Sequence, residues 1–285
     1  MANQADILAH YDAHQEILLE VLDPILLGYS SGFWRGTRNA TEAQLRKFEY
    51  IAEKVNLAAC DTVLEVGSGW GSFAKFCQLH FPNVQVHGLT LSESQKAFVK
   101  SQDWAHATIY LSDWKDFHPA RTYDAIVSVE SIEHYASMED RRSGTHIDAY
   151  RRFFEWCRDC TTDRALIYVQ SSIARRNPDD LQSVMDSRLI VERVFTGSAL
   201  PTLASLQLAA APLYEFEELQ LHGQDMALTM AAWGAQLKLK EQDLRARFGD
   251  AAVKFMEDYF DAGVRCFRKG HVDTLALTLR RAALV

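Results

Sequence analysis

The chain has 285 residues, 48% of them hydrophobic, and a formal net charge of −8 at pH 7. This hydrophobic fraction is ordinary for a globular protein with a full core, and the length suits one α/β domain with extra helices. The acidic balance argues against a nucleic-acid partner, because phosphate binding needs a concentrated basic surface.

The first twenty residues contain four acidic side chains and no basic start followed by an apolar run, so we expect no secretory signal. No stretch of about 18 uninterrupted apolar residues occurs, and we expect no transmembrane segment. The pair Cys157 and Cys160 lies in a segment of helical periodicity, and no second Cys/His pair stands at zinc spacing. We therefore expect structural thiols, no metal and a cytoplasmic protein.

Short apolar runs alternate with segments of helical periodicity from residue 62 to residue 170. This alternation predicts an α/β fold with a doubly wound, mostly parallel sheet. Ser92, with Gln95 three residues later, is typical of a helix start. The predicted strands are Thr62–Val66, Val84–Leu89, Ala107–Leu111, Asp124–Val129 and Ala165–Gln170, and the predicted helices are Gly71–Leu79, Ser92–Ser101 and Ile147–Cys160.

Two regions do not follow this alternation. Residues 1–58 are predicted to form an N-terminal helical cap before the cofactor-binding core at 59–171. Residues 172–215 contain three prolines and are predicted to be an inserted helical lid, followed by C-terminal helices and the last strands at 216–285. Within the lid, the apolar stretch Leu200–Leu213 could form a pocket wall or touch a membrane surface. The lack of a basic polar face favours the pocket wall.

A glycine-rich motif joins the first predicted strand to the next helix. Gly67, Gly69 and Gly71 permit a tight turn and let a ligand approach the backbone closely. Glycine spacing alone would also suit a dinucleotide, but the acidic Glu65 beside the turn would repel a pyrophosphate. A carboxylate there stabilises a cationic ligand, which favours S-adenosylmethionine over NAD.

The chain resembles the cyclopropane-fatty-acid and mycolic-acid cyclopropane synthase family, a branch of the class I methyltransferases, nearly from end to end. This resemblance implies a Rossmann-like, seven-stranded, mostly parallel sheet with N-terminal helices and an inserted helical lid. The matching residues are His10-Tyr-Asp12, Leu22-Asp-Pro24, Tyr29-Ser30, Ala43-Gln44 with Lys47, Glu65 to Ser72, Gly88 to Ser92 with Gln95, Glu133-His134, Leu200-Pro201, Thr229 with Trp233, and Phe255 to Gly270.

The resemblance also implies a cofactor site for S-adenosylmethionine. Tyr29 and Ser30 would close over its methionine end, and the glycine turn would lie beneath it. Asp113 and Trp114 would frame the adenine. The full set of expected cofactor contacts is Tyr29, Ser30, Glu65, Gly67, Ser68, Gly69, Thr90, Leu91, Gln95, Asp113, Trp114 and Val129.

One part of the family pattern is altered. Cyclopropane synthases hold a bicarbonate ion that is thought to take up a proton. At the family's ligand positions this chain has Ser31 for a cysteine, Gln170 for a histidine and Met226 for a tyrosine, and retains the acidic Glu133. A carboxylate without these donors should repel an anion, so we expect no bicarbonate.

Candidates for proton handling cluster at the end of the fourth predicted strand. Glu130, Glu133 and His134 follow this strand, and strand ends in such sheets face the ligand crevice. Partial burial would raise a carboxyl pKa and make it a usable base.

Aromatic residues are expected to form a wall of the acceptor pocket. Tyr29, Phe33 and Trp34, with Trp70 nearby, could stabilise a cation there. Phe33 and Trp34 complete the expected substrate pocket, together with Ser31, Gln170 and Met226.

Together these features predict a methyltransferase that acts on an apolar small molecule of secondary metabolism. Carbon methylation of an alkene, in an isoprenoid or acyl chain, is the favoured reaction. N- or O-methylation of a small amine or phenol, and retained cyclopropane synthesis on phospholipid acyl chains, are the alternatives. A catalytically silent binding module is a third possibility, against which the intact Gly67, Gly69, Gln95 and Glu133 argue.

Overall fold

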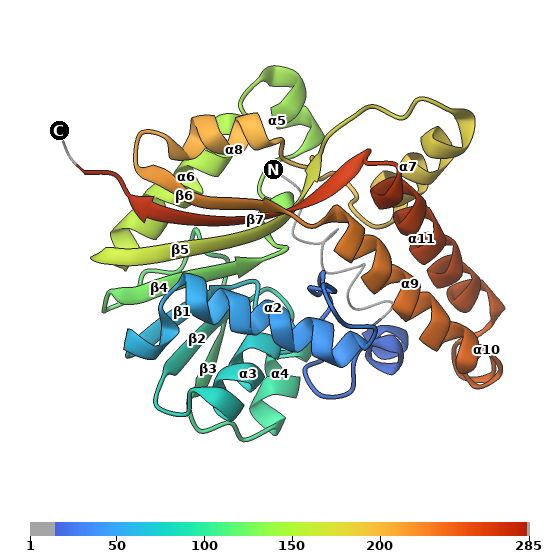
Figure 1. The fold of residues 1–285 in the computed structure, drawn as a ribbon, viewed down its shortest axis with the longest axis horizontal. Helices are drawn as coiled ribbons and strands as arrows, with labels where there is room; N and C mark the ends of the chain where they lie inside the picture. Colours follow the sequence, from blue (N-terminus) through green and yellow to red (C-terminus); the bar gives the residue numbers. More distant parts are fainter. Residues whose placement is uncertain (1–14, 284–285) are drawn as a thin grey trace.

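A twisted seven-stranded sheet with helices on both faces forms the centre of the protein (Figure 1). The computed structural model describes residues 15–283. The strand order is β3-β2-β1-β4-β5-β7-β6, and only β7 is antiparallel to its neighbours. The strands are β1 (Thr62–Val66), β2 (Gln85–Thr90), β3 (Ala107–Leu111), β4 (Tyr123–Val129), β5 (Thr161–Ala174), β6 (Tyr214–Leu221) and β7 (Val272–Arg281).

The described helices cover both faces and one end of this sheet. They are α2 (Ala40–Lys54), α3 (Ser72–His80), α4 (Glu93–Ser101), α5 (Met138–Ser143), α6 (His146–Cys160), α7 (Leu181–Arg193), α8 (Leu203–Ala210), α9 (Gly223–Leu239), α10 (Glu241–Phe248) and α11 (Asp250–Arg268). The seven-stranded, mostly parallel fold and the five strands predicted from apolar runs are confirmed.

Two hydrophobic layers hold the helices against the sheet. On one face α6 buries Phe153, Phe154 and Cys157 against the inner strands, and α8 adds Leu206. On the other face α2 and α3 bury Phe48 and neighbouring aromatic rings. Strands covered on both faces are nearly continuous apolar runs, which explains why β1 and β4 were recognisable in the sequence.

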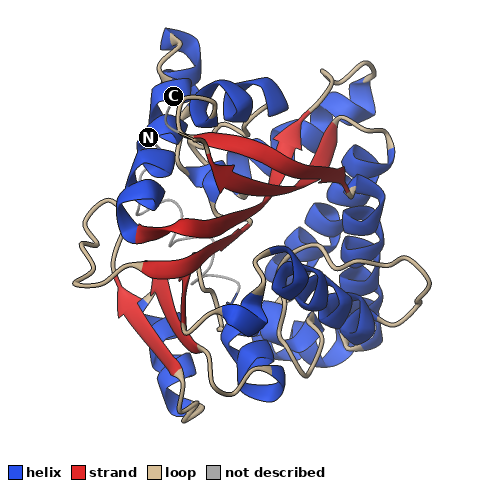
Figure 2. Cartoon of the chain, turned by 60° about the vertical axis from the view of Figure 1, so that its left-hand side comes forward, coloured by secondary structure: helices blue, strands red, loops and turns tan. Residues whose placement is uncertain are grey.

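A third hydrophobic cluster lies beyond the carboxyl ends of the parallel strands. It joins α9, α10 and α11 to a helical segment at residues 15–21, and α7 packs on α11. Figure 1 shows these helices gathered at one end of the sheet, and Figure 2 shows the twist of the strands from another side. This cluster forms a roof over the sheet edge where ligands bind in doubly wound folds.

The region expected to be a lid differs from the expectation in two ways. Residues 172–174 continue β5, which pairs with β7 as far as Ala174, so the insertion begins only after this residue. The stretch Leu200–Leu213 is mostly not a pocket wall, because α8 within it packs on α6 in the main core. Outside this region, the polar stretch before α6 contains the exposed helix α5, which starts with a capping box formed by Ser137 and Asp140.

Cys157 and Cys160 are free thiols buried on α6, in agreement with a structural role. Burial raises the pKa of both thiols. Within residues 15–283 no helix combines the length and apolar character needed to cross a bilayer. The family-matching segment His10-Tyr-Asp12 lies outside the described residues.

Replacing Asn39 by alanine is expected to weaken α2, the helix that carries Gln44 and Lys47 to the site. The Asn39 side chain accepts a hydrogen bond from the backbone N–H of Glu42 at 3.0 Å and caps the helix. Loss of an N-cap costs about 1 kcal/mol of unfolding free energy, roughly 2–4 °C in melting temperature. Thermal unfolding measures this, and Asn39→Asp, which keeps the acceptor, should melt with the wild type.

Candidate active site

The glycine motif forms a left-handed turn beneath a large cavity at the end of β1. Gly67, Gly69 and Gly71 have φ angles of 81°, 52° and 78°, which side chains rarely adopt. A Cβ atom at Gly67 would lie 2.6 Å from the Cβ of Ser131, whereas at Gly69 it would meet no atom of residues 15–283 within 4 Å. Gly69 therefore faces open space, and this cavity has a volume of about 400 Å³, within the range of small-molecule sites.

All twelve residues expected to contact the cofactor line this cavity. The lining of this cavity is acidic. Among the described residues, four carboxylate side chains and one lysine, Lys115, border it, and Lys115 Nζ lies 2.9 Å from Asp113 Oδ2. These acidic residues are Glu65, Asp113, Asp116 and Glu130. An excess of carboxylates favours a ligand with positive charge.

Glu65 is the deepest of these carboxylates and lies at the end of β1. Its side chain is only 4% exposed, and its Oε2 atom has no hydrogen-bond partner among the described residues. Burial raises the pKa of Glu65 well above its usual value, although the nearby Lys47 lowers it in part. A buried acceptor without a partner is costly, and a ligand that donates a hydrogen bond would satisfy it.

Lys47 is the buried cation that balances this region. It is fully buried on α2 and donates from Nζ to Ser30 Oγ at 2.7 Å and to Gln44 Oε1 at 2.5 Å. Burial lowers its pKa to about 8, while Glu130 and Glu65 oppose this shift. Lys47 thus anchors Ser30 at the rim of the cavity.

The far part of the cavity is formed by the residues after β2 and β3. Thr90 donates from its hydroxyl to Gln95 Oε1 at 2.7 Å and orients that amide. Ser92 caps α4 by accepting from the backbone N–H of Gln95, which confirms the predicted helix start. Trp114 is buried against Phe153, and its indole N–H has no hydrogen-bond partner in the part of the chain that the structure describes. These groups offer an aromatic face and polar atoms to a ring system.

A second, smaller cavity of about 70 Å³ adjoins the first under α7, α9 and α11. Tyr29, Glu130 and His134 line both cavities and therefore mark their junction. The ring centroid of Tyr29 lies 5.2 Å from that of Trp233 and 6.2 Å from that of Trp70. The remaining lining is largely apolar and includes Ile190, Val194, Phe195, Met226, Met230, Tyr259 and Phe267.

Glu130 at the junction and Glu133 in the smaller cavity have different environments. Glu130 Oε1 accepts from the backbone N–H of Ser31 at 2.9 Å and from Gln170 Nε2 at 3.0 Å. Glu133 accepts from the backbone N–H of Ser172, and its Oε2 atom has no partner among the described residues. Burial and the neighbouring Glu130 raise the pKa of Glu133 to about 8, so this carboxyl group is the protonated member of the pair at neutral pH.

His134 is placed as a neutral residue at the same junction. Its Nδ1 lies 3.1 Å from Ser198 Oγ, and its ring stacks on Phe195 with a centroid distance of 5.4 Å. Burial lowers its pKa to about 4. A base with this pKa is poorly matched to proton removal near neutrality.

Four of the expected acceptor-pocket residues lie elsewhere. Ser31 and Gln170 are fully buried behind Glu130 and do not line either cavity. Phe33 stacks on His222 at a centroid distance of 4.1 Å, and Trp34 donates from Nε1 to Thr229 at 2.8 Å. Phe33 and Trp34 therefore do not belong to the predicted aromatic wall. Stacking and hydrogen bonding hold their rings against α9 and the residue that precedes it.

Sequence reasoning missed Lys47 as part of the site, and Trp233, Met230 and Tyr259 as lining of the second cavity. The three lining residues come from α9 and α11, more than 90 residues after the junction at Glu130. The available signal was the spacing Met226, Met230 and Trp233, which places these residues on one buried face of α9.

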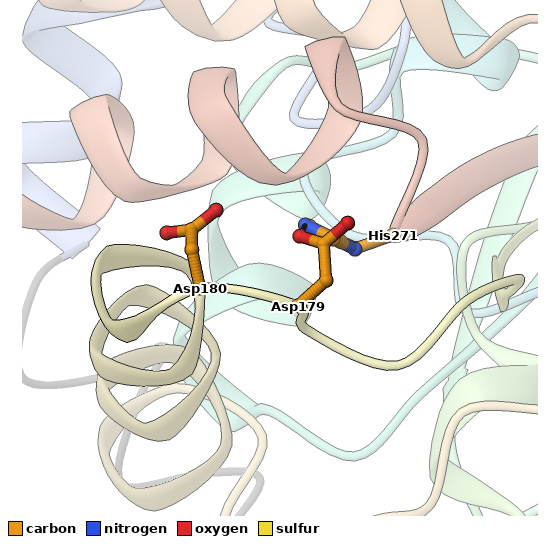
Figure 3. Close-up of side chains that lie close together, drawn as sticks. All are labelled: Asp179, Asp180 and His271. Atoms are coloured by element: carbon orange, nitrogen blue, oxygen red, sulfur yellow. Dashed lines mark ion pairs between the residues drawn. The ribbon is translucent and has the colours of Figure 1, made fainter.

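One group of described side chains has the composition of a metal site. Asp179, Asp180 and His271 lie together at the start of α7 (Figure 3). However, Asp180 caps α7 through the backbone N–H of Ser183 at 2.9 Å and pairs with Lys269 Nζ at 2.7 Å. These contacts occupy Asp180 and place an ammonium group beside it. The group borders neither cavity and fits the task of fixing the start of α7.

The fold and this site define a class I S-adenosylmethionine-dependent methyltransferase. The open space at Gly69, the orphaned acceptor of Glu65 and the acidic cavity all fit a cofactor that carries a sulfonium and an ammonium group. Solved structures support the fold. The cyclopropane synthase MmaA2 from Mycobacterium tuberculosis matches with a TM-score of 0.87 and 22% identity over 99% of both chains. Mycolic acid cyclopropane synthase CmaA1, complexed with SAH and CTAB, matches with a TM-score of 0.86 and 23% identity over 98% of both chains.

The chain belongs to the mycolic acid cyclopropane synthetase family, whose model matches residues 1–277. Methoxy mycolic acid synthase MmaA3 from Mycobacterium tuberculosis is 26% identical and aligns over 98% of this chain and 96% of its own length. The cyclopropane-fatty-acyl-phospholipid synthase of Escherichia coli is 25% identical over 91% of this chain and 63% of its own length. The family predicted from the sequence motifs is thereby confirmed.

Proposed function

We propose that this methyltransferase adds a methyl group to an alkene carbon of a short apolar acceptor and that a carboxylate of the chain removes a proton afterwards. The observation that carries this proposal is the junction of the two cavities, where Glu130 meets a chamber with mostly apolar walls. An amine or phenol acceptor would need polar partners to orient its heteroatom, and few polar atoms face this chamber. An alkene needs shape and charge stabilisation instead.

The cofactor supplies an electrophilic methyl group when it is bound, and the chain's residues position the acceptor and manage charge. Glu65 and the glycine turn would hold the methionine end, and Trp114 the adenine. Tyr29 at the junction and Trp233 in the smaller cavity offer aromatic rings, whose cation–π attraction of about 0.5–2 kcal/mol each would stabilise positive charge on the acceptor.

The size of the second cavity favours a short acceptor. Its volume of about 70 Å³ is about half that of a 150 Å³ cavity known to hold benzene, so it suits the branched end of an isoprenoid. A long acyl chain, as the names of the cyclopropane synthase relatives imply for those proteins, would require Met226 and Met230 to move.

Methyl-labelled cofactor identifies the atom that is methylated. The protein would be incubated with [methyl-13C]S-adenosylmethionine and, in separate reactions, geraniol, 3-methyl-3-buten-1-ol, a tetrahydroisoquinoline, and vesicles of unsaturated phosphatidylethanolamine. We expect a new C–CH₃ signal by NMR with one of the isoprenoid alcohols. Label found only as N–CH₃ or O–CH₃ contradicts methylation of carbon, whereas a cyclopropane CH₂ shows that the proton is lost from the new methyl group and assigns the cyclopropane synthase alternative.

A further inference from the structure

Glu130 is held in place by the two residues that stand at altered ligand positions of the family. The backbone N–H of Ser31 and Nε2 of Gln170 both donate to Oε1, and Gln170 also donates to the carbonyl of Ser31 at 3.2 Å. Within residues 15–283, Oε2 of Glu130 accepts no hydrogen bond. One oxygen is therefore fixed by donors, and the other is available at the junction of the cavities.

The backbone at Glu130 is strained. Its φ angle is 49°, in the left-handed region that a glutamate rarely occupies. The conformation is maintained by a hydrogen bond of 2.8 Å from the Glu130 N–H to the carbonyl of Gln170 on β5. A residue that holds a charged side chain in a strained conformation, between two cavities, is typical of a functional site.

The charges around Glu130 favour its ionised form over that of its neighbour. Burial raises the pKa of Glu130 above its usual value, and the two hydrogen-bond donors and the ammonium of Lys47 oppose this shift. Glu133 has a backbone donor and the unfavourable charge of Glu130 beside it. The negative charge of the pair therefore resides mainly on Glu130.

We propose that Glu130 is the catalytic base of this enzyme and that its carboxylate fills an anion position formed by the backbone N–H of Ser31 and Nε2 of Gln170. This inference rests on the proposed function, since a base is required only if the acceptor loses a proton from carbon.

The step balances with the residues present. The π electrons of the acceptor form the new C–CH₃ bond, and the electron pair of the broken S–CH₃ bond remains on sulfur. A neighbouring C–H bond of the acceptor then breaks, its electrons close the alkene again, and the proton passes to Oε2 of Glu130. After product release, this proton returns to solvent through the larger cavity.

Glu130→Gly with sodium [13C]formate tests the assignment without an acceptor. Glycine accepts the φ angle of 49°, so this variant should fold and melt no lower than the wild type. Removal of the side chain leaves the donors of Ser31 and Gln170 facing an empty space. Formate should therefore broaden its NMR signal and raise the melting temperature with Glu130→Gly, and do neither with the wild type. Equal responses of both proteins would overturn the anion position.

Turnover tests the role as a base, with the acceptor that the labelling experiment identifies. Glu130→Gly should lose 10²- to 10⁴-fold in turnover and keep its affinity for S-adenosylmethionine, and formate should restore at least tenfold. Glu130→Gln should not be restored, because its amide fills the space. Glu133→Gln should lose less turnover than Glu130→Gln. Full activity of Glu130→Gly without formate would refute the proposal, whereas an inactive wild type would instead contradict the proposed function.

Discussion

Gly69→Val should abolish binding of S-adenosylmethionine and leave the fold intact. The added side chain would project into the larger cavity, where no atom of the described residues lies within 4 Å of the Cβ position, and would take the space that the cofactor needs. The φ angle of 52° adds backbone strain of about 1–2 kcal/mol, which a domain of this size should tolerate. Calorimetry should show at least a hundredfold loss of affinity, with an unchanged circular dichroism spectrum.

Gly144→Val is the matched control for this variant. Gly144 also has a positive φ angle, 80°, and open space around its Cβ position, but it ends α5 on the surface. Both variants should therefore lose similar stability, while only Gly69→Val loses the cofactor. Wild-type affinity in Gly69→Val would show that the cofactor does not lie against this turn.

The free energy of unfolding should depend on pH through Glu133. Burial and the charge of Glu130 raise the pKa of Glu133 to about 8, against about 4.3 in an unfolded chain. Between about pH 4.3 and about pH 8, Glu133 is therefore protonated in the native state and ionised in the unfolded state. The stabilising contribution is complete below about pH 4.3 and is lost as pH rises through about 8. Since one pKa unit corresponds to about 1.4 kcal/mol, the loss amounts to several kcal/mol.

Glu133→Gln keeps the neutral form at every pH and should remove this dependence. Melting temperatures measured from pH 5 to pH 9 should fall less steeply for the variant, which becomes more stable than the wild type above pH 8. Parallel curves for the two proteins would mean that Glu133 is already ionised in the native state. Glu218→Gln is a suitable control, because Glu218 is a surface carboxyl group whose pKa is lowered by Lys54.

The fold was largely predictable because its central strands are apolar and its glycine turn is specific. β1 to β5 stood out as short apolar runs; β1 and β4 are buried along most of their length because both of their faces are covered, whereas β3 is partly exposed. β6 was harder to recognise, because the sequence from Tyr214 to Leu221 alternates with acidic residues on its exposed side. The same reason led us to expect too short a β5, whose first residues are partly exposed.

The lining of the larger cavity was predictable from the sequence, and the lining of the smaller cavity was not. Most of the residues expected to contact the cofactor come from turns that directly follow β1, β2 and β3, so local sequence fixes where they lie. The side chains of Phe33, Trp34 and Gln170 are oriented by contacts with residues far away in the sequence. These partners are His222, Thr229 and Glu130. No local pattern encodes such partners, and the strained backbone of Glu130 could be seen only in the structure.

The two cavities are lined mainly by different halves of the chain. Apart from the three junction residues and Glu133, the smaller cavity is bounded by residues numbered 172 to 272, whereas the larger one is bounded by residues 27 to 135. Changes in the second half of the chain can therefore alter which acceptor fits without disturbing the methyl donor.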